Sequence, residues 1–157
     1  MVLLAPMTEA EFDQWLEHSI PDYARQHVRA GNWNEEEALG RSRQEHAQLL
    51  PNGLRTPEHF FFTIRAEPRG ERVGELWYAF RHEGPRTDLY VYWVGIDEAH
   101  RRRGYARETF ALLEPAARQH GAGRILLHVF GDNLAAMALY ERIGFITTNV
   151  MMEKPIV

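Results

Sequence analysis

The sequence predicts a mixed α/β fold, in which helices cover both faces of a central, mostly antiparallel sheet. The first third of the chain places apolar residues at helical spacing, and the middle third is rich in aromatic and β-branched residues, as strands are. The last third alternates strand, helix and strand, an order that implies a right-handed crossover between two parallel neighbours. The length suits one domain spanning residues 1–157.

The helical third follows a short apolar start. Thr8 stands three residues before Glu11, which is the spacing of a capping box, and apolar residues at helical spacing come after it. Pro21 suits the first turn of a second helix. Asn34 repeats the capping signal and opens a third helix.

Three strands are expected next. The segments "HFFFTIRA" (59–66) and "RVGELWYAF" (72–80) flank the turn-rich "EPRGE" and predict a hairpin. The turn "HEGPRTD" leads into "LYVYWVGI" (89–96), the third strand.

The last third begins with a helix over 104–120, whose apolar residues recur at helical spacing. The segment "RILLHVF" (124–130) is predicted to be a strand, and a second helix covers 133–144. The segment "FITTNVMMEKP" (145–155) predicts a final strand.

Composition argues against several classes of function. The chain has no cysteine, which excludes disulfides and thiolate nucleophiles, and its eight histidines show no metal-ligand spacing, so no metal is expected. A formal net charge of -4 argues against a general nucleic-acid binder, whose affinity rests on a broad basic surface. No apolar run reaches the length of a membrane span, and the start of the chain lacks the pattern of a signal peptide. A cytoplasmic protein without nucleic-acid or membrane partners is expected.

Against this acidic background, "RRRGYA" (101–106) lies between a predicted strand and a predicted helix. The start of a helix leaves backbone N–H groups unpaired and carries partial positive charge. Gly104 has no side chain to keep a ligand away from the backbone. Such a turn can cradle a phosphate or pyrophosphate, to which Arg101, Arg102 and Arg103 would add charge. A solvated basic loop is the alternative.

A second motif, "NLAAMALYERIGF" (133–145), follows on the next predicted helix. Taken alone, Asn133 reads as a helix cap and Tyr140 as one aromatic residue on a helix. The order strand, R-x-x-G-x-A turn, helix, strand, N-x-x-A-x-x-L-Y-x-x-x-G-F resembles the GNAT-type N-acetyltransferase superfamily. The residues that carry the resemblance are Ile96, Arg101, Gly104, Ala106, Asn133, Ala136, Leu139, Tyr140, Gly144 and Phe145.

The resemblance implies acetyl-coenzyme A (acetyl-CoA) as the donor. Its pyrophosphate would lie on the amides from about Arg102 through Tyr105 to Ala106, and its pantetheine arm would hydrogen-bond the main chain near Val94 and Ile96. In the family, the strand that carries these last two residues splays away from the next strand and leaves a slot for the thioester.

The resemblance also implies that Asn133 lines the pantetheine arm and that Tyr140 reaches the sulfur. The chemistry of acetyl transfer to an amine also requires a proton acceptor and a proton donor. A primary amine with a pKa near 10.4 costs roughly 4.6 kcal/mol to deprotonate at pH 7, so a base or a water chain should take its proton. A tyrosine is still protonated at that pH and can donate to the leaving thiolate, which suits Tyr140 to the role of general acid.

The base is less evident from the residues. Many members of the family carry a carboxylate on the strand before the phosphate turn, where this chain reads "YWVG" (92–95). Glu75, inside an aromatic strand, is the first candidate, and an outward-facing glutamate is its structural alternative. His128 is the second candidate, and a packed, hydrogen-bonded histidine is the alternative there.

The expected acceptor is a small-molecule amine or the amino group of a peptide. Asp22, Tyr23 and Trp33 could bind it, although core packing and helix-start electrostatics also explain them. An acyltransferase that modifies a hydroxyl or uses a bulkier acyl group, and a sensor that binds the coenzyme without turnover, remain open alternatives. Since members of the family occur as monomers and as dimers, a homodimer is possible.

Overall fold

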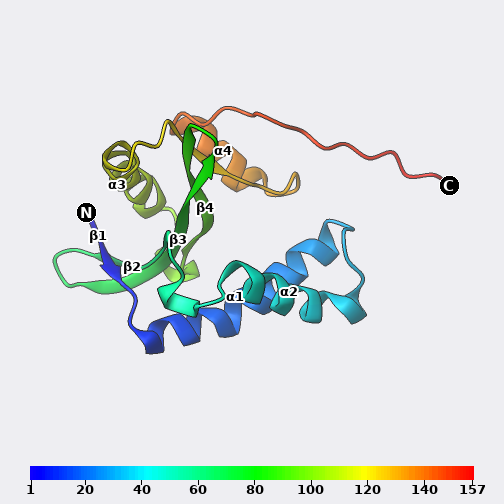
Figure 1. The fold of residues 1–157 in the computed structure, drawn as a ribbon, viewed down its shortest axis with the longest axis horizontal. Helices are drawn as coiled ribbons and strands as arrows, with labels where there is room; N and C mark the ends of the chain where they lie inside the picture. Colours follow the sequence, from blue (N-terminus) through cyan, green and yellow to red (C-terminus); the bar gives the residue numbers. More distant parts are fainter.

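A computed structural model describes residues 1–157 (Figure 1). Five strands form one sheet in the order β1-β2-β3-β4-β5, where β1 to β4 are antiparallel neighbours and β4 and β5 are parallel. The strands are β1 (Val2–Pro6), β2 (His59–Ala66), β3 (Glu71–Glu83), β4 (Arg86–Ile96) and β5 (Arg124–Leu127). The helices are α1 (Glu9–Arg29), α2 (Glu35–Leu49), α3 (Tyr105–Gln119) and α4 (Leu134–Arg142). The predicted mixed α/β fold with its strand, helix, strand crossover is confirmed.

Helices lie on both faces of the sheet. Figure 1 shows α1 and α2 on one side of the strands and α3 and α4 on the other. On the α3 side, Leu89, Phe110 and Leu113 belong to the larger apolar core. On the α1 side, the fully buried Trp15 packs edge-on against Trp77, with ring centroids 5.3 Å apart.

The helix starts agree with the sequence signals. At the start of α1, the Glu11 amide donates to Thr8 Oγ1 (3.2 Å) and the Thr8 amide donates to Glu11 Oε2 (2.9 Å), which completes the capping box. At the start of α2, the Glu37 amide donates to Asn34 Oδ1 (2.9 Å).

Pro21 does not begin a helix. The chain is helical without a break through α1, so the prediction of two separate helices is wrong. A proline inside a helix costs about 3 kcal/mol, because one hydrogen bond is lost and the ring crowds the preceding turn. Burial of Trp15 and Ser19 before the proline and of Ala24 after it holds both flanks in the same helix.

Both ends of the chain depart from the predictions. β1 pairs with β2 over residues 2–6, although no strand was predicted in this short apolar segment at the start of the chain. β5 ends at Leu127 rather than at 130, and the strand predicted over 145–155 does not form. The last segment meets no strand of its own chain, and a strand needs a neighbour to satisfy its backbone groups. None of the helices is both long enough and apolar enough to cross a membrane.

One buried histidine couples the packing of α1 and α2 to pH. His46, 7 % exposed, has Nδ1 2.8 Å from the Ser42 carbonyl oxygen and Nε2 3.1 Å from Ser19 Oγ. Because a carbonyl only accepts, the proton belongs on Nδ1, and the Ser19 hydroxyl donates to Nε2. Burial lowers the pKa of His46 below its ordinary value.

This arrangement predicts that acid destabilises the protein. The unfolded chain binds a proton at His46 at higher pH than the folded chain does, so the contribution to stability is full above about pH 6.5 and falls as the pH drops below it. Urea unfolding at pH 7 and pH 5 should give a smaller unfolding free energy at pH 5, and His46→Gln should reduce this difference. An unchanged difference in the variant would contradict the assignment.

Candidate functional site

The arginine turn joins β4 to α3 through two residues with left-handed backbone. Arg102 has φ 61° and Gly104, the residue that caps α3, has φ 84°. Glycine adopts this conformation without the strain that a side chain brings. The space where a Cβ would stand at Gly104 is open, so the backbone there is accessible to a ligand.

The turn leaves a row of amides free. The backbone N–H groups of residues 102–107 donate to no protein acceptor, and the first bond of α3 runs from the Glu108 amide to the Gly104 carbonyl (3.0 Å). Free amides at a helix start, together with the helix dipole, attract an anion. The side chains of Arg101, Arg102 and Arg103 are exposed around them, and Arg101 Nε donates to the Ile96 carbonyl oxygen at 3.0 Å. The residues therefore fit a diphosphate.

Arg72 of β3 braces the start of this turn. It donates to Glu75 with one nitrogen and to Asp97 Oδ2 (2.7 Å) with another, and the Asp97 amide donates to the Val73 carbonyl oxygen (2.9 Å). The sequence did not point to Arg72, because its partner Asp97 lies 25 positions away and becomes a neighbour only when β3 and β4 pair.

In the residues of β4 that precede the turn, this strand separates from β5. The two strands pair only between Asp88–Val91 and Arg124–Leu127, whereas β4 continues to Ile96. Tyr92 has no register partner on β3, because Trp77 pairs with Trp93 and Tyr78 with Val91. A bulge of this kind bends a strand and increases its twist. The edge of β4 that faces β5 is therefore unpaired at Val94 and Ile96, the residues that the resemblance places beside the pantetheine arm.

Two other predicted residues belong to α4 and its N-terminal cap. Tyr140 is half-buried, with its ring centroid 5.6 Å from that of Phe110 and 5.7 Å from that of Phe145. Burial raises the pKa of Tyr140 above its ordinary value, so the phenol keeps its proton at neutral pH. Asn133 caps the helix, since the Ala136 amide donates to its Oδ1 at 3.2 Å. The NH₂ group of this side chain remains as a donor.

Glu75 and Tyr140 do not meet. Glu75 is 6 % exposed and faces α1, where its Oε2 lies 3.0 Å from His18 Nε2 and its Oε1 accepts from Arg72. It lines a cavity of about 220 Å³ on that side of the sheet. Tyr140 packs on the α3 side, against Phe110.

The second candidate base lies elsewhere. His128 comes directly after Leu127, the last residue of β5 that pairs with β4, so it stands where the two strands part. Its side chain is exposed, and its ring contacts Phe130 edge-on at 4.9 Å between centroids.

The C-terminal end of α1 lies against the residues that follow β5. The Arg29 guanidinium lies 2.6 Å from the Asp132 carboxylate, and the rings of His27 and Phe130 meet edge-on at 5.2 Å. One turn earlier, the Tyr23 hydroxyl donates to Glu45 Oε2 at 2.9 Å. This hydrogen bond joins a tyrosine of α1 to a carboxylate of α2.

The other two residues considered for the acceptor have structural partners. Asp22 accepts hydrogen bonds from Arg25 and Gln26 on its own helix. Trp33 is buried and stacks on His27 with centroids 4.0 Å apart.

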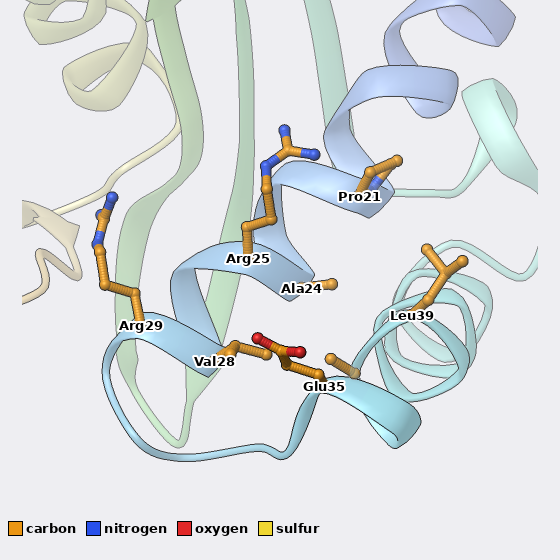
Figure 2. A pocket seen from close by; sticks show the side chains of 8 residues that line it. Pro21, Ala24, Arg25, Val28, Arg29, Glu35 and Leu39 are labelled. Atoms are coloured by element: carbon orange, nitrogen blue, oxygen red, sulfur yellow. The ribbon is translucent and has the colours of Figure 1, made fainter.

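A separate cavity lies between α1 and α2 (Figure 2). It has a volume of about 410 Å³, and Figure 2 shows Arg25 and Arg29 from one helix and Glu35 from the other at its wall. The residues that line it come from α1 and α2 alone, so it is distinct from the gap beside β4.

Comparison with known proteins identifies a family whose sequence pattern includes the arginine turn and α4. The chain matches the sequence profile of the Acetyltransferase (GNAT) family over residues 12–145, a span that includes the arginine turn and α4. The protein YycN of Bacillus subtilis (strain 168), described as an uncharacterized N-acetyltransferase, is 38 % identical over 153 residues, covering 98 % of this chain and 97 % of that protein. YdgE of the same organism, also described as an uncharacterized N-acetyltransferase, is 36 % identical over 151 residues, covering 96 % of each chain.

Two solved structures have the same fold as this chain. The crystal structure of YycN superposes with a TM-score of 0.93 at 37 % identity, covering 100 % of this chain and 99 % of that chain. AAC(6')-Iy, solved in complex with the bisubstrate analogue CoA-S-monomethyl-acetylneamine, shares the fold with a TM-score of 0.65 at 12 % identity, covering 100 % and 99 % of the two chains.

Proposed function

Because the chain belongs to the Acetyltransferase (GNAT) family, we propose that it moves an acetyl group from acetyl-CoA to the primary amine of a small molecule or peptide. The observation that carries the proposal is the row of free amides at 102–107, next to the unpaired stretch of β4. A fold neighbour that was solved with a coenzyme A bisubstrate analogue supports the choice of donor.

The donor would be held in two places. The diphosphate binds the amides from Arg102 to Arg107, with the exposed arginines of the turn around it. The pantetheine arm follows the unpaired edge of β4 past Ile96 and Val94, and the free NH₂ group of Asn133 is a further donor. The thioester then reaches the point where β4 and β5 part.

The reaction needs one proton acceptor and one proton donor. The neutral amine attacks the thioester carbonyl, a C–N bond forms, the C–S bond breaks, and the amine proton passes to a base. Tyr140 donates its phenolic proton to the departing sulfur, and the raised pKa of its buried side chain keeps that proton available at neutral pH.

Position favours His128 over Glu75 as the base. His128 is exposed where the strands part, and a neutral imidazole nitrogen can accept a proton. Glu75 is engaged by Arg72 and His18, and Arg72 also binds Asp97 at the start of the turn. A chain of water molecules between the amine and His128 would carry the proton equally well.

Two variants separate these candidates. His128→Asn is expected to lower kcat about 100-fold and to leave the acetyl-CoA dissociation constant unchanged, because general bases contribute about 10²–10⁴-fold. Glu75→Gln is expected to keep kcat and to weaken acetyl-CoA binding, because the turn is loosened. Thiol release at saturating substrate and calorimetry give the two readouts. The opposite pattern in the two variants would make Glu75 the base.

The acceptor is proposed to enter from α1 and α2, where Glu45 and the Tyr23 hydroxyl would attract a cationic amine. Thiol release from acetyl-CoA, followed across polyamines, amino acids, peptides and hydroxyl acceptors, tests the function. Turnover with a cationic amine is the expected result. Turnover on hydroxyl acceptors alone would indicate an O-acyltransferase, and coenzyme binding without any turnover would indicate a sensor.

A further inference from the structure

One arginine of the sheet has no carboxylate partner. Five arginines lie on the strands, and four of them bind an aspartate or a glutamate: Arg65, Arg72, Arg86 and Arg124. Arg81 of β3 is the fifth, and its exposed side chain forms no ion pair. Asp88, its register partner on β4, is bound instead by Arg124 at 2.8 Å and lies 3.4 Å from Arg86. Arg81 is therefore free to bind an anion that arrives from solution.

Arg81 lies over an aromatic surface. Its guanidinium carbon is 4.6 Å from the centroid of the Tyr90 ring, a distance at which a cation is attracted to the face of the ring. The Tyr90 ring lies 4.6 Å from that of Tyr92, which stacks on Trp77 at 4.5 Å. The stack holds the guanidinium in place before a ligand arrives, which lowers the entropic cost of binding.

This stack faces α1 and α2. Leu89 and Val91 belong to the core on the α3 side, and side chains alternate between the two faces of a strand, so Tyr90 between them points to the opposite face. Tyr92 packs on that face against the smaller apolar cluster, which contains residues of α1. Arg81 shares the face, because its guanidinium lies over Tyr90. It is the side from which the acceptor is proposed to enter.

The same stack stands beside the gap between β4 and β5. Tyr90 pairs with β5 one position before Val91, where the pairing ends. Tyr23 of α1 is also near, since burial, the Glu45 carboxylate and the neighbouring Tyr90 raise the pKa of its phenol. A negative group, Glu45, and a positive group, Arg81, therefore lie on the acceptor side of the sheet, each next to a tyrosine of this region.

We propose that Arg81 binds a carboxylate of the acceptor, so that the preferred acceptor is an amine that also carries a carboxylate, as amino acids and peptides do. This inference rests on the proposed function, because the amine must reach the thioester while the carboxylate is held at Arg81. The planar guanidinium can bind both carboxylate oxygens at once, which orients the acceptor as well as attracting it. One free arginine matches one negative charge, since Arg86 and Arg124 are already bound to Asp88.

Pairs of acceptors that differ only in the carboxylate test the proposal. Lysine is compared with cadaverine, phenylalanine with phenethylamine, and β-alanine with ethylamine, by calorimetry on protein saturated with coenzyme A. The member with the carboxylate is expected to bind about 10-fold more tightly, because its hydrogen bonds to Arg81 are charge-assisted. O-phosphoethanolamine, which carries a phosphate in place of the carboxylate of β-alanine, is the test for a phosphate site.

Three variants assign the preference to its residue. Arg81→Gln should remove the preference for the carboxylate and leave the binding of the plain amines unchanged, whereas Arg81→Lys should keep part of it. Arg69→Gln is the matched control, because it removes the same charge from the turn between β2 and β3 and should keep the full preference. An unchanged affinity for coenzyme A verifies that each variant is folded.

Turnover separates this proposal from the proposed function. Thiol release from acetyl-CoA should show the same preference in kcat/KM, and Arg81→Gln should remove it. Turnover of the amines without a preference, or a preference that survives in Arg81→Gln, overturns the role of Arg81 and leaves acetyl transfer intact. A preference in binding without any turnover supports the role of Arg81 and counts against acetyl transfer. Binding of O-phosphoethanolamine alone, or of no member of the panel, overturns the carboxylate assignment.

Discussion

Replacing Tyr140 with phenylalanine is expected to lower kcat about 100-fold, because in the proposed mechanism its phenol protonates the departing sulfur. The ring still packs on Phe110 and Phe145, so the fold and the acetyl-CoA dissociation constant should change little. Thiol release under saturating acetyl-CoA measures kcat, and calorimetry measures the dissociation constant.

The pH dependence of that variant distinguishes a proton donor from a packing residue. In the wild-type protein, burial raises the pKa of Tyr140, so its proton is lost only well into the alkaline range. If Tyr140 is the general acid, a fall of kcat at alkaline pH should be present in the wild type and absent in Tyr140→Phe. Leu139→Ala, one position away on α4, is the control for general disturbance of the helix. Equal turnover by the wild type and Tyr140→Phe would remove Tyr140 from the mechanism.

Placing a negative charge at Gly104 is expected to weaken acetyl-CoA binding severely. Gly104→Asp and Gly104→Asn form a matched pair, because both side chains tolerate the left-handed conformation that φ 84° requires. A carboxylate about 4 Å from one charge costs about 1 kcal/mol in a water-like medium, and a diphosphate carries about two charges. The aspartate variant should therefore bind acetyl-CoA roughly 30-fold more weakly than the asparagine variant.

Salt provides the second readout for this pair. The difference between the two variants should shrink as the salt concentration rises, because exposed charges are screened. Calorimetric titrations at low and high salt measure it. Equal affinities of Gly104→Asp and Gly104→Asn at low salt would place the diphosphate away from the turn.

The features that local sequence predicts well are those that rest on nearby residues. The cap formed by Thr8 and Glu11 involves residues three positions apart, and the structure contains it as predicted. The strand, turn and helix around Gly104 also follow from adjacent residues, because a helix start always leaves its first amides free.

The features that sequence does not predict depend on contacts between distant parts of the chain. Pro21 stays inside α1 because the residues on both sides of it are buried. The contact of Glu75 with His18 could not be predicted either, because His18 lies on α1, 57 positions away in the sequence. The strand expected over 145–155 has the right composition but no neighbouring strand within its own chain.

A crystal structure of the protein with coenzyme A tests the central claim most directly. The diphosphate oxygens should lie within hydrogen-bonding distance of the backbone nitrogens between Arg102 and Arg107, with the pantetheine arm beside Val94 and Ile96. A diphosphate bound elsewhere, for example in the cavity between α1 and α2, would contradict the account.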